Sequence, residues 1–262
     1  MTSKPSLTVL VVGATGSIGR LVVAEALRQG HSVRALVRDV HKAARLPASA
    51  TTIVGDVTRP ETLVAAVEGI DAVVLALGSE GAGKAGAENV DYGGVRNILT
   101  ALGDGSSRIT LMTAIGVTNR TGDYNRRTQA HDWKRRAERL VRASGHPYTV
   151  VRPGWFDYQA ADEQRIVMLQ GDTRQAGDAT DGAIARAQIA RVLVDSLTTD
   201  TAKNKTFELI AEQGDAQPDL APAFDSLESD DPASLDAIRD ADNQPLADEP
   251  QRVRDDLDAI RN

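Results

Sequence analysis

The sequence of 262 residues contains no cysteine and few aromatic residues, and each shortage excludes a class of function. Without cysteine, the chain forms no disulfide, no thiolate metal site and no cysteine nucleophile. Aromatic residues make up 3% of the chain, so stacking platforms for single-stranded nucleic acid are scarce. The net charge of −7 also argues against a nucleic-acid-binding surface. We therefore expect no nucleic-acid partner.

Long apolar runs are also absent from the sequence. No stretch approaches the roughly 20 consecutive apolar residues that a membrane-spanning helix requires. The N-terminal sequence has a short apolar run that leads directly into a glycine-rich turn, whereas a signal peptide needs a longer apolar segment and a cleavage site. The four histidines are not spaced like metal ligands. The sequence thus predicts a cytoplasmic protein with no membrane partner and no metal site.

The charges that are present are distributed unevenly along the chain. Residues 215–262 contain 14 acidic and four basic residues, a net charge of −10, which leaves +3 for residues 1–214. Apolar residues recur in this C-terminal extension at helical spacing, which favours short helices docked on the rest of the protein. Residues 120–142 contain eight basic and three acidic residues and are a candidate docking surface for the extension. The alternative is that these basic residues form an ordinary solvated helix face that the extension does not contact.

Short apolar runs alternate with helical patterns over the first 150 residues. Strands are predicted at 7–12, 32–37, 51–54, 72–77, 108–113 and 148–151, with helices between them at 17–29, 58–69, 88–102 and 129–144. Apolar strands that alternate with helices indicate an α/β fold with a doubly wound parallel sheet buried on both faces. Beyond Pro153, two short strands at 166–170 and 206–210 and a helix at 187–197 are predicted.

A glycine-rich turn, Gly13-Ala-Thr-Gly16-Ser-Ile-Gly19, follows the first predicted strand and precedes the first predicted helix. Glycines at these positions allow a tight turn, close approach of the backbone to a pyrophosphate, and close packing of helix on strand. Free N–H groups at the helix start then bind phosphate. The alternative is a plain strand-to-helix turn. The position of the glycine-rich turn between a strand and a helix favours a Rossmann-like, dinucleotide-binding fold. The predicted cofactor-binding residues of the turn are Gly13, Thr15, Gly16, Ser17, Ile18 and Gly19.

The GATG form of this turn resembles the short-chain dehydrogenase/reductase superfamily, and within it the atypical, NmrA-like NAD(P)H-binding branch. The resemblance covers about residues 7–210 and includes Ala35-Leu-Val-Arg-Asp39, Gly55-Asp-Val57, Val90-Asp-Tyr92, Lys134-Arg-Arg-Ala-Glu138 and Val150-Val-Arg-Pro-Gly154. It implies a nucleotide-binding domain at 1–154 and a substrate-side region of the same domain at 155–214. The C-terminal extension, 215–262, has no counterpart in the resemblance.

Two side chains at the end of the second predicted strand bear on which nucleotide binds. An arginine there accommodates the 2′-phosphate of NADP, whereas a carboxylate binds the ribose 2′-hydroxyl of NAD. Arg38 and Asp39 stand side by side. In the branch that the sequence resembles, the arginine faces the phosphate, so we expect NADP rather than NAD, with Arg38 as its ligand. The alternative is a solvated Arg38 with Asp39 on the ribose.

Two further segments are expected to contact the cofactor. The resemblance places Asp56 and the backbone of Val57 at the adenine. The alternative is that Asp56 is a turn residue ahead of a helix capped by Thr58. The fourth strand ends where the cofactor crosses the carboxyl edge of the sheet, at Ala76, Leu77 and Gly78.

The predicted site lacks the usual group that transfers a proton. Ordinary members of the superfamily use a tyrosine four residues before a lysine, assisted by a serine after the fifth strand. The resemblance assigns Lys134 to the lysine, which binds the nicotinamide ribose, and Thr113 to the hydroxyl that orients the substrate oxygen. Ala130 stands at the tyrosine position and transfers no proton. His131, Tyr124 and water are the alternative donors.

These residues predict an NADPH-dependent oxidoreductase of a small carbonyl, enone or quinone-like substrate. The cofactor supplies the chemistry, so the protein mainly positions the reactants. Because the tyrosine is missing, one alternative is a non-catalytic NADP(H)-binding redox sensor. Another is a sugar-nucleotide epimerase-like enzyme, which also needs the Tyr-Lys pair.

Overall fold

The strands and helices of the chain alternate over most of its length, within the residues that the computed structural model describes, 5–79 and 82–261. The strands are β1 (Thr8–Val12), β2 (Ser32–Val37), β3 (Thr51–Val54), β4 (Ala72–Leu75), β5 (Arg108–Met112), β6 (Tyr148–Pro153), β7 (Trp155–Phe156), β8 (Arg165–Leu169), β9 (Ala183–Ile184) and β10 (Lys205–Glu212). The α-helices are α1 (Gly19–Arg28), α2 (Val40–Ala43), α3 (Val64–Val67), α4 (Gly83–Gly86), α5 (Gly93–Leu102), α6 (Asp123–Thr128), α7 (Ala130–Ala143), α8 (Arg186–Thr198), α9 (Ala221–Asp225) and α10 (Gln251–Arg261). A π-helix at Ala87–Tyr92 precedes α5, and short 3-10 helices occur at Pro60–Thr62, Ala179–Asp181, Asp200–Ala202 and Leu246–Asp248.

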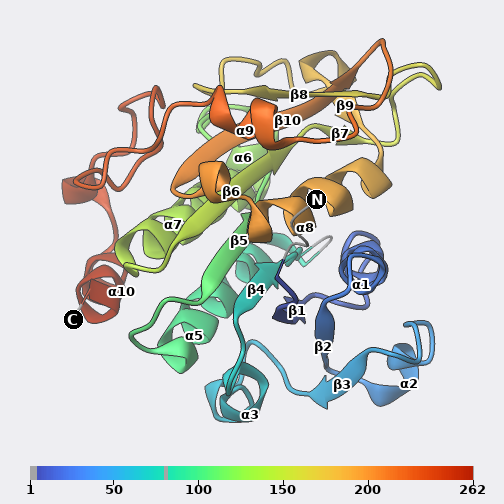
Figure 1. The fold of residues 1–262 in the computed structure, drawn as a ribbon. Coiled ribbons are helices and arrows are strands. Elements are labelled where there is room, and N and C mark those ends of the chain that lie inside the picture. The colour runs from blue at the N-terminus through green and yellow to red at the C-terminus, as the bar shows by residue number, and fades with distance from the viewer. Residues whose placement is uncertain (1–4, 80–81, 262) are drawn as a thin grey trace.

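Eight of the described strands form one sheet in the order β3-β2-β1-β4-β5-β6-β10-β8 (Figure 1). Neighbouring strands run parallel except for β10 and β8, which are antiparallel. From β1 the chain proceeds to β2 and β3 on one side, and then to β4, β5 and β6 on the other. The strand order therefore reverses between β1 and β4, and the predicted doubly wound α/β fold is confirmed.

Side chains of β1 alternate between two hydrophobic cores, one on each face of the sheet. Val9 and Val11 belong to the core that includes residues of α1 and α8. Leu10 and Val12 belong to the core that includes residues of α5 and α7. Helices thus cover both faces of the sheet (Figure 1), which explains why the central strands β1 and β4 are almost entirely apolar rather than alternating.

The long helix predicted at 88–102 is divided in the structure. Its first part is the π-helix at Ala87–Tyr92, and α5 follows from Gly93. The wider π turn accommodates an extra residue, and both Asp91 and Tyr92, neighbours in sequence, are buried. Hydrophobic spacing alone does not distinguish this arrangement from a continuous α-helix.

The C-terminal extension is docked on the sheet and on α7. Phe224 of α9 packs against Phe207 of β10, with ring centroids 5.8 Å apart. Val253 and Leu257 of α10 are buried in the core that α5 and α7 share. In Figure 1 the red end of the chain lies beside α7. The prediction that the extension docks as short helices is confirmed.

Arginines of α7 hold the extension through buried ion pairs. The pairs with N–O distances of 2.6 to 3.3 Å are Arg135–Asp236, Arg136–Glu249, Arg139–Asp236, Arg139–Glu249 and Arg142–Asp230. The predicted association of the acidic extension with the basic stretch is therefore confirmed, and this face of α7 is not a solvated surface.

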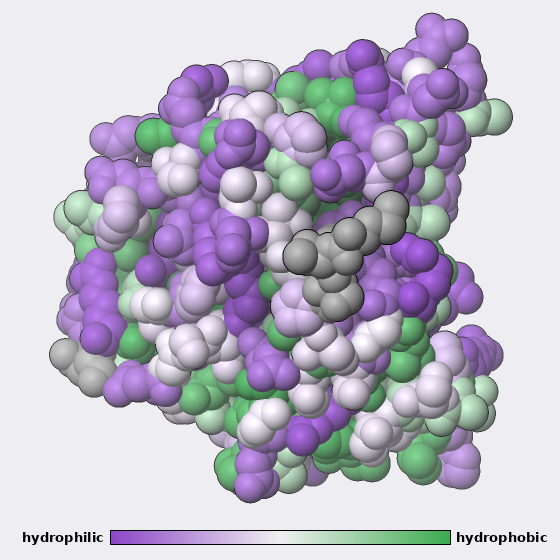
Figure 2. Space-filling model, viewed as in Figure 1, coloured by the Kyte–Doolittle hydropathy of each residue, from purple (hydrophilic) through white to green (hydrophobic). Residues whose placement is uncertain are grey.

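The face of the molecule seen in Figure 2 is mostly polar. Figure 2 shows hydrophilic side chains over most of the face in view, with hydrophobic ones in small groups between them. Among the described helices, none combines the length and the apolar character that crossing a bilayer demands.

Candidate functional site

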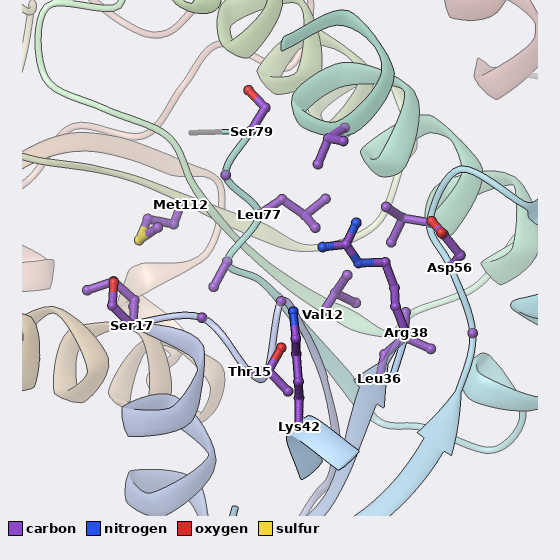
Figure 3. A pocket seen from close by; sticks show the side chains of 18 of the residues that line it. Val12, Thr15, Ser17, Leu36, Arg38, Lys42, Asp56, Leu77, Ser79 and Met112 are labelled. Carbon is purple, nitrogen blue, oxygen red and sulfur yellow. The ribbon is translucent and has the colours of Figure 1, made fainter. Parts of the chain in front are cut away.

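A cavity of about 660 Å³ lies at the carboxyl ends of β1, β2 and β4 (Figure 3). The glycine turn after β1 forms its floor, and residues that follow β2, β3 and β4 form its walls. Met112 of β5 and Phe156 of β7 also line it. This is the place where the strand order reverses, and open α/β sheets bind their ligands at such positions.

Two glycines of the turn occupy positions that no other residue fits. Gly13 has a φ of +84°, and a Cβ atom there would lie 2.3 Å from the carbonyl oxygen of Ala76. A Cβ atom at Gly19 would lie 2.0 Å from the carbonyl oxygen of Gly13. The first glycine brings β1 close to the end of β4, and the second lets α1 begin against the turn. The N-terminus of this ten-residue helix therefore faces the cavity floor.

Most of the predicted cofactor-binding residues line this one cavity. They are Gly13, Thr15, Gly16, Ser17, Ile18, Arg38, Asp56, Val57, Ala76, Leu77 and Gly78. Gly19 serves helix packing instead, and Lys134 and Thr113 are not among the lining residues. The structure thus brings together the predicted contacts of a dinucleotide but not the predicted catalytic pair.

One side of the cavity is basic. Figure 3 shows the side chains of Arg38 and Lys42 directed into the same space, and Arg45 lines it as well. Asp39 is not a lining residue, because its Oδ1 accepts a hydrogen bond from the backbone N–H of His41 at 2.9 Å and so caps α2. Sequence reasoning missed Lys42 and Arg45, although their spacing after Arg38 was a visible signal.

Asp56 lies on the same side of the cavity and forms a turn. Its Oδ1 accepts hydrogen bonds from the backbone N–H and the hydroxyl of Thr58, both at 2.9 Å. Burial favours the neutral acid, but these bonds and the charge of Arg38 outweigh it and hold the pKa of Asp56 below its ordinary value. The prediction that Thr58 caps the following helix is wrong. The Thr58 hydroxyl donates to Asp56 instead, and Arg59 is the residue that precedes the 3-10 helix at Pro60–Thr62.

The cavity is also lined by Leu77, Gly78, Ser79, Met112 and Phe156. Figure 3 places Ser79 and Met112 away from Arg38 and Asp56, across the end of β1. Sequence reasoning placed Phe156 in a wall of the substrate pocket, and the cavity lining agrees. It missed Ser79 and Met112, whose signal is their position at or just beyond the ends of β4 and β5.

Lys134 of α7 reaches the cavity wall only through other residues. Its Nζ lies 2.8 Å from Oδ1 of Asp91 in the π-helix. The second oxygen of Asp91 accepts a hydrogen bond from the hydroxyl of Ser79, which lines the cavity. The Asp91 side chain is 2% exposed and that of Lys134 15% exposed, so the ion pair is shielded from water.

Thr113 is engaged on the far side of β5. Its hydroxyl donates to Oε1 of Glu138 at 2.7 Å. Burial favours the neutral acid at Glu138, but the guanidinium of Arg152 outweighs it and lowers the pKa of Glu138 to about 2. Ala130, at the position of the superfamily tyrosine, is buried in the core that α5 and α7 share. Neither Thr113 nor Ala130 is therefore placed to give a proton to a ligand in the cavity.

The two alternative donors do not line the cavity. His131 packs its ring 5.1 Å from that of Tyr124. Burial lowers the pKa of His131 below its ordinary value, although nearby Asp172 acts in the opposite direction. Tyr124 is about half exposed, and its ring lies outside the cavity.

The model of a family described as NAD(P)H-binding matches residues 13–200 of this chain. The chain belongs to this family. The match begins at the first glycine of the turn and ends before the C-terminal extension. It confirms the resemblance to atypical short-chain dehydrogenases/reductases at the level of an NAD(P)H-binding family.

Named relatives of the family include reductases and proteins of other description. Sanguinarine reductase from Eschscholzia californica is 28% identical over 268 residues, which cover 86% of this chain and 97% of the relative. The photosystem II assembly factor Ycf39 from Synechocystis sp. is 30% identical over 207 residues, 78% of this chain. The chain covers 62% of the length of that factor, less than two thirds.

Solved structures share the fold of this chain. An NAD-dependent epimerase/dehydratase-like protein from Bacillus halodurans has a TM-score of 0.69 at 23% identity, with 85% of this chain and 100% of that chain covered. ChuY, an anaerobillin reductase from Escherichia coli O157:H7, has a TM-score of 0.60 at 20% identity, with 81% and 100% covered. At these identities the similarity establishes the fold alone.

Proposed function

We propose that this NAD(P)H-binding protein is an oxidoreductase that uses NADPH to reduce a small carbonyl, enone or quinone-like substrate. The observation that carries the choice of NADPH is the basic side of the cavity, where Arg38 and Lys42 point inward while Asp39 caps α2. A guanidinium binds the 2′-phosphate of NADP, and a carboxylate that is engaged elsewhere is not available to the ribose 2′-hydroxyl of NAD.

The residues of the cavity fit a dinucleotide. The cradle that a Cβ atom at Gly13 would fill, together with the N-terminus of α1, suits a pyrophosphate. Arg38 and Lys42 would hold the 2′-phosphate, and Asp56 and Val57 would border the adenine. The side formed by Leu77, Ser79, Met112 and Phe156 then remains for the nicotinamide and the substrate. When bound, NADPH supplies a hydride.

The alternative is a redox sensor that binds both forms of the cofactor and consumes neither. The absence of a tyrosine at position 130 favours it, whereas the relationship to a protein named as a reductase favours an enzyme. The predicted cytoplasmic location stays a prediction, and a small molecule is the partner that the cavity suits.

Turnover distinguishes the two functions. NADPH absorbance at 340 nm is followed after addition of 9,10-phenanthrenequinone, menadione, an aromatic aldehyde and a cyclic enone, each in turn. We expect at least one of them to be reduced at a rate proportional to protein concentration. Binding of NADPH and NADP⁺ with no consumption in the presence of any acceptor would support the sensor instead.

A further inference from the structure

Reduction of a carbonyl or a quinone requires a proton as well as a hydride, and the tyrosine that supplies it elsewhere in the superfamily is replaced by Ala130. We propose that Ser79, Asp91 and Lys134 form a proton relay that takes its place, with Ser79 as the residue that contacts the substrate oxygen. The inference rests on the proposed function, because it assigns the proton source for that reaction.

Ser79 is placed on the side of the cavity where the reaction is expected. The basic side, with Arg38, lies beyond β2, whereas Ser79 follows β4 on the other side of the strand-order reversal. Figure 3 shows Arg38 and Ser79 on opposite sides of the end of β1, so a dinucleotide whose 2′-phosphate were held at Arg38 would extend toward Ser79. Among the side chains that line this end, Ser79 carries a hydroxyl that is already linked to an ionised pair.

The relay is continuous and shielded. Ser79 donates to one oxygen of Asp91, and Nζ of Lys134 donates to the other at 2.8 Å. Because the Asp91 side chain is 2% exposed, each bond acts in a medium of low dielectric constant and holds its geometry. Lys134 is 15% exposed, so water can restore its proton after each turnover.

Neighbouring residues fix the position of Asp91. It lies in the π-helix, a rare geometry that is frequent at functional sites. The adjacent Tyr92 donates its hydroxyl proton to Asp256 of the C-terminal extension at 2.9 Å. The ring of Tyr92 also packs 5.3 Å from that of Trp133, the residue before Lys134. The π-helix that carries Asp91 is thus packed against α7, which carries Lys134, and is also hydrogen-bonded to α10.

The proton balance of the step follows from this order. As the carbonyl carbon gains a hydride, the π electrons of the carbonyl bond move to oxygen, and that oxygen takes the proton of the Ser79 hydroxyl. Before this step Lys134 transfers a proton to Asp91, and the Ser79 hydroxyl turns from Asp91 toward the substrate oxygen. Ser79 then takes the proton of the neutral Asp91 carboxyl group as it gives up its own, and Lys134 regains a proton from water. The net change is one carbonyl and one proton consumed with one NADPH, and one alcohol and one NADP⁺ formed.

Three substitutions test the relay in single-turnover experiments with excess protein, NADPH and 9,10-phenanthrenequinone. Ser79→Ala and Asp91→Asn are expected to slow the reduction by about 100-fold, the usual contribution of a positioned acid. Lys134→Met is expected to slow it similarly. The Kd for NADPH, measured by cofactor fluorescence, is expected to change less than about threefold in each variant, since none of the three holds the phosphates.

Ser196→Ala is the matched control. It removes a fully buried hydroxyl, which lies 2.8 Å from the hydroxyl of Thr110 and does not line the cavity. We expect its rate to equal that of the unsubstituted protein. The relay also predicts that the rate falls along a curve as the D₂O fraction rises, because more than one proton moves, and that Ser79→Ala abolishes this curvature.

The possible outcomes separate the relay from the proposed function. Unchanged rates in Ser79→Ala and Asp91→Asn overturn the relay while reduction itself stands. A raised Kd for NADPH in Lys134→Met, with an unchanged rate at saturation, makes Lys134 a cofactor ligand and also overturns the relay. Reduction of no acceptor by a protein that binds NADPH overturns relay and oxidoreductase together, and failure to bind NADPH overturns the proposed cofactor.

Discussion

Arg152 of β6 and Asp240 of the C-terminal extension form a bidentate ion pair, with both guanidinium N–H groups donating to the carboxylate at 2.7 Å. Neither side chain is more than 1% exposed. Arg152 also pairs with Glu138 of α7 and with Glu208 of β10. The extension therefore completes the charge balance of a site inside the protein, and is an integral part of the fold.

Removing one partner of this pair is expected to destabilise the protein. Asp240→Asn leaves a buried guanidinium short of a counter-charge, and we expect the free energy of unfolding to fall by about 3 to 5 kcal/mol. Equilibrium unfolding in guanidinium chloride measures this difference in the free energy of unfolding. Glu228→Gln is the control, since its pair with Arg239 is more than half exposed on both sides and is expected to contribute less than about 1 kcal/mol. Equal losses in the two variants would contradict the account.

Glu208, in the same cluster, predicts a pH dependence of stability. Burial, with the nearby charges of Asp172 and Asp240, raises the pKa of Glu208 to about 7 even though Arg152 opposes the shift. A raised carboxyl pKa stabilises the fold fully below the unfolded value near 4.5, and this stabilisation is lost as pH rises through 7. Between pH 5 and 8.5 this loss amounts to about 3 kcal/mol.

Glu208→Gln is expected to remove that loss, so that its free energy of unfolding changes less between pH 5 and 8.5 than that of the unsubstituted protein. Glu138, with its pKa of about 2, contributes stability that is lost only below pH 4.5 and does not interfere in this window. The same pH dependence in both proteins would show that Glu208 is not the titrating group.

The glycine turn gives a third prediction. Gly13→Ala places a methyl group against the carbonyl oxygen of Ala76, at a φ that disfavours any side chain. We expect NADPH binding to weaken by 100-fold or more, because the turn has to open. Gly30→Ala is the matched control: its φ of +86° is nearly the same, but nothing lies within 4 Å of the added atom. We expect it to cost about 1 kcal/mol of stability and to leave the Kd for NADPH unchanged.

The strands and the glycine turn could be predicted because their signals are local. Apolar runs at 32–37 and 51–54 match β2 and β3 residue for residue. Complementary charge also predicted that the extension docks on the basic stretch. It did not predict Arg152 as a partner of Asp240, because a strand arginine far along the chain is indistinguishable in sequence from a surface residue.

The proposed proton relay could not be predicted from the sequence either, because its three residues are far apart along the chain. Ser79, Asp91 and Lys134 lie on a loop, a π-helix and an α-helix, and only the packing of these elements brings them together. The family resemblance pointed to Lys134 and Thr113 as one site. The structure separates them, because Thr113 donates to Glu138 while Lys134 pairs with Asp91.

The measurement that tests the central claim most directly is a fluorescence titration of the protein with NADPH and with NADH. We expect the unsubstituted protein to bind NADPH at least 10-fold more tightly, and Arg38→Ala to remove most of that preference, since a charged hydrogen bond to phosphate contributes about 1.5 to 3 kcal/mol. Lys203→Ala, an exposed lysine paired with Asp200, is the control and is expected to preserve the preference. Equal affinities of the unsubstituted protein for NADPH and NADH would contradict the account.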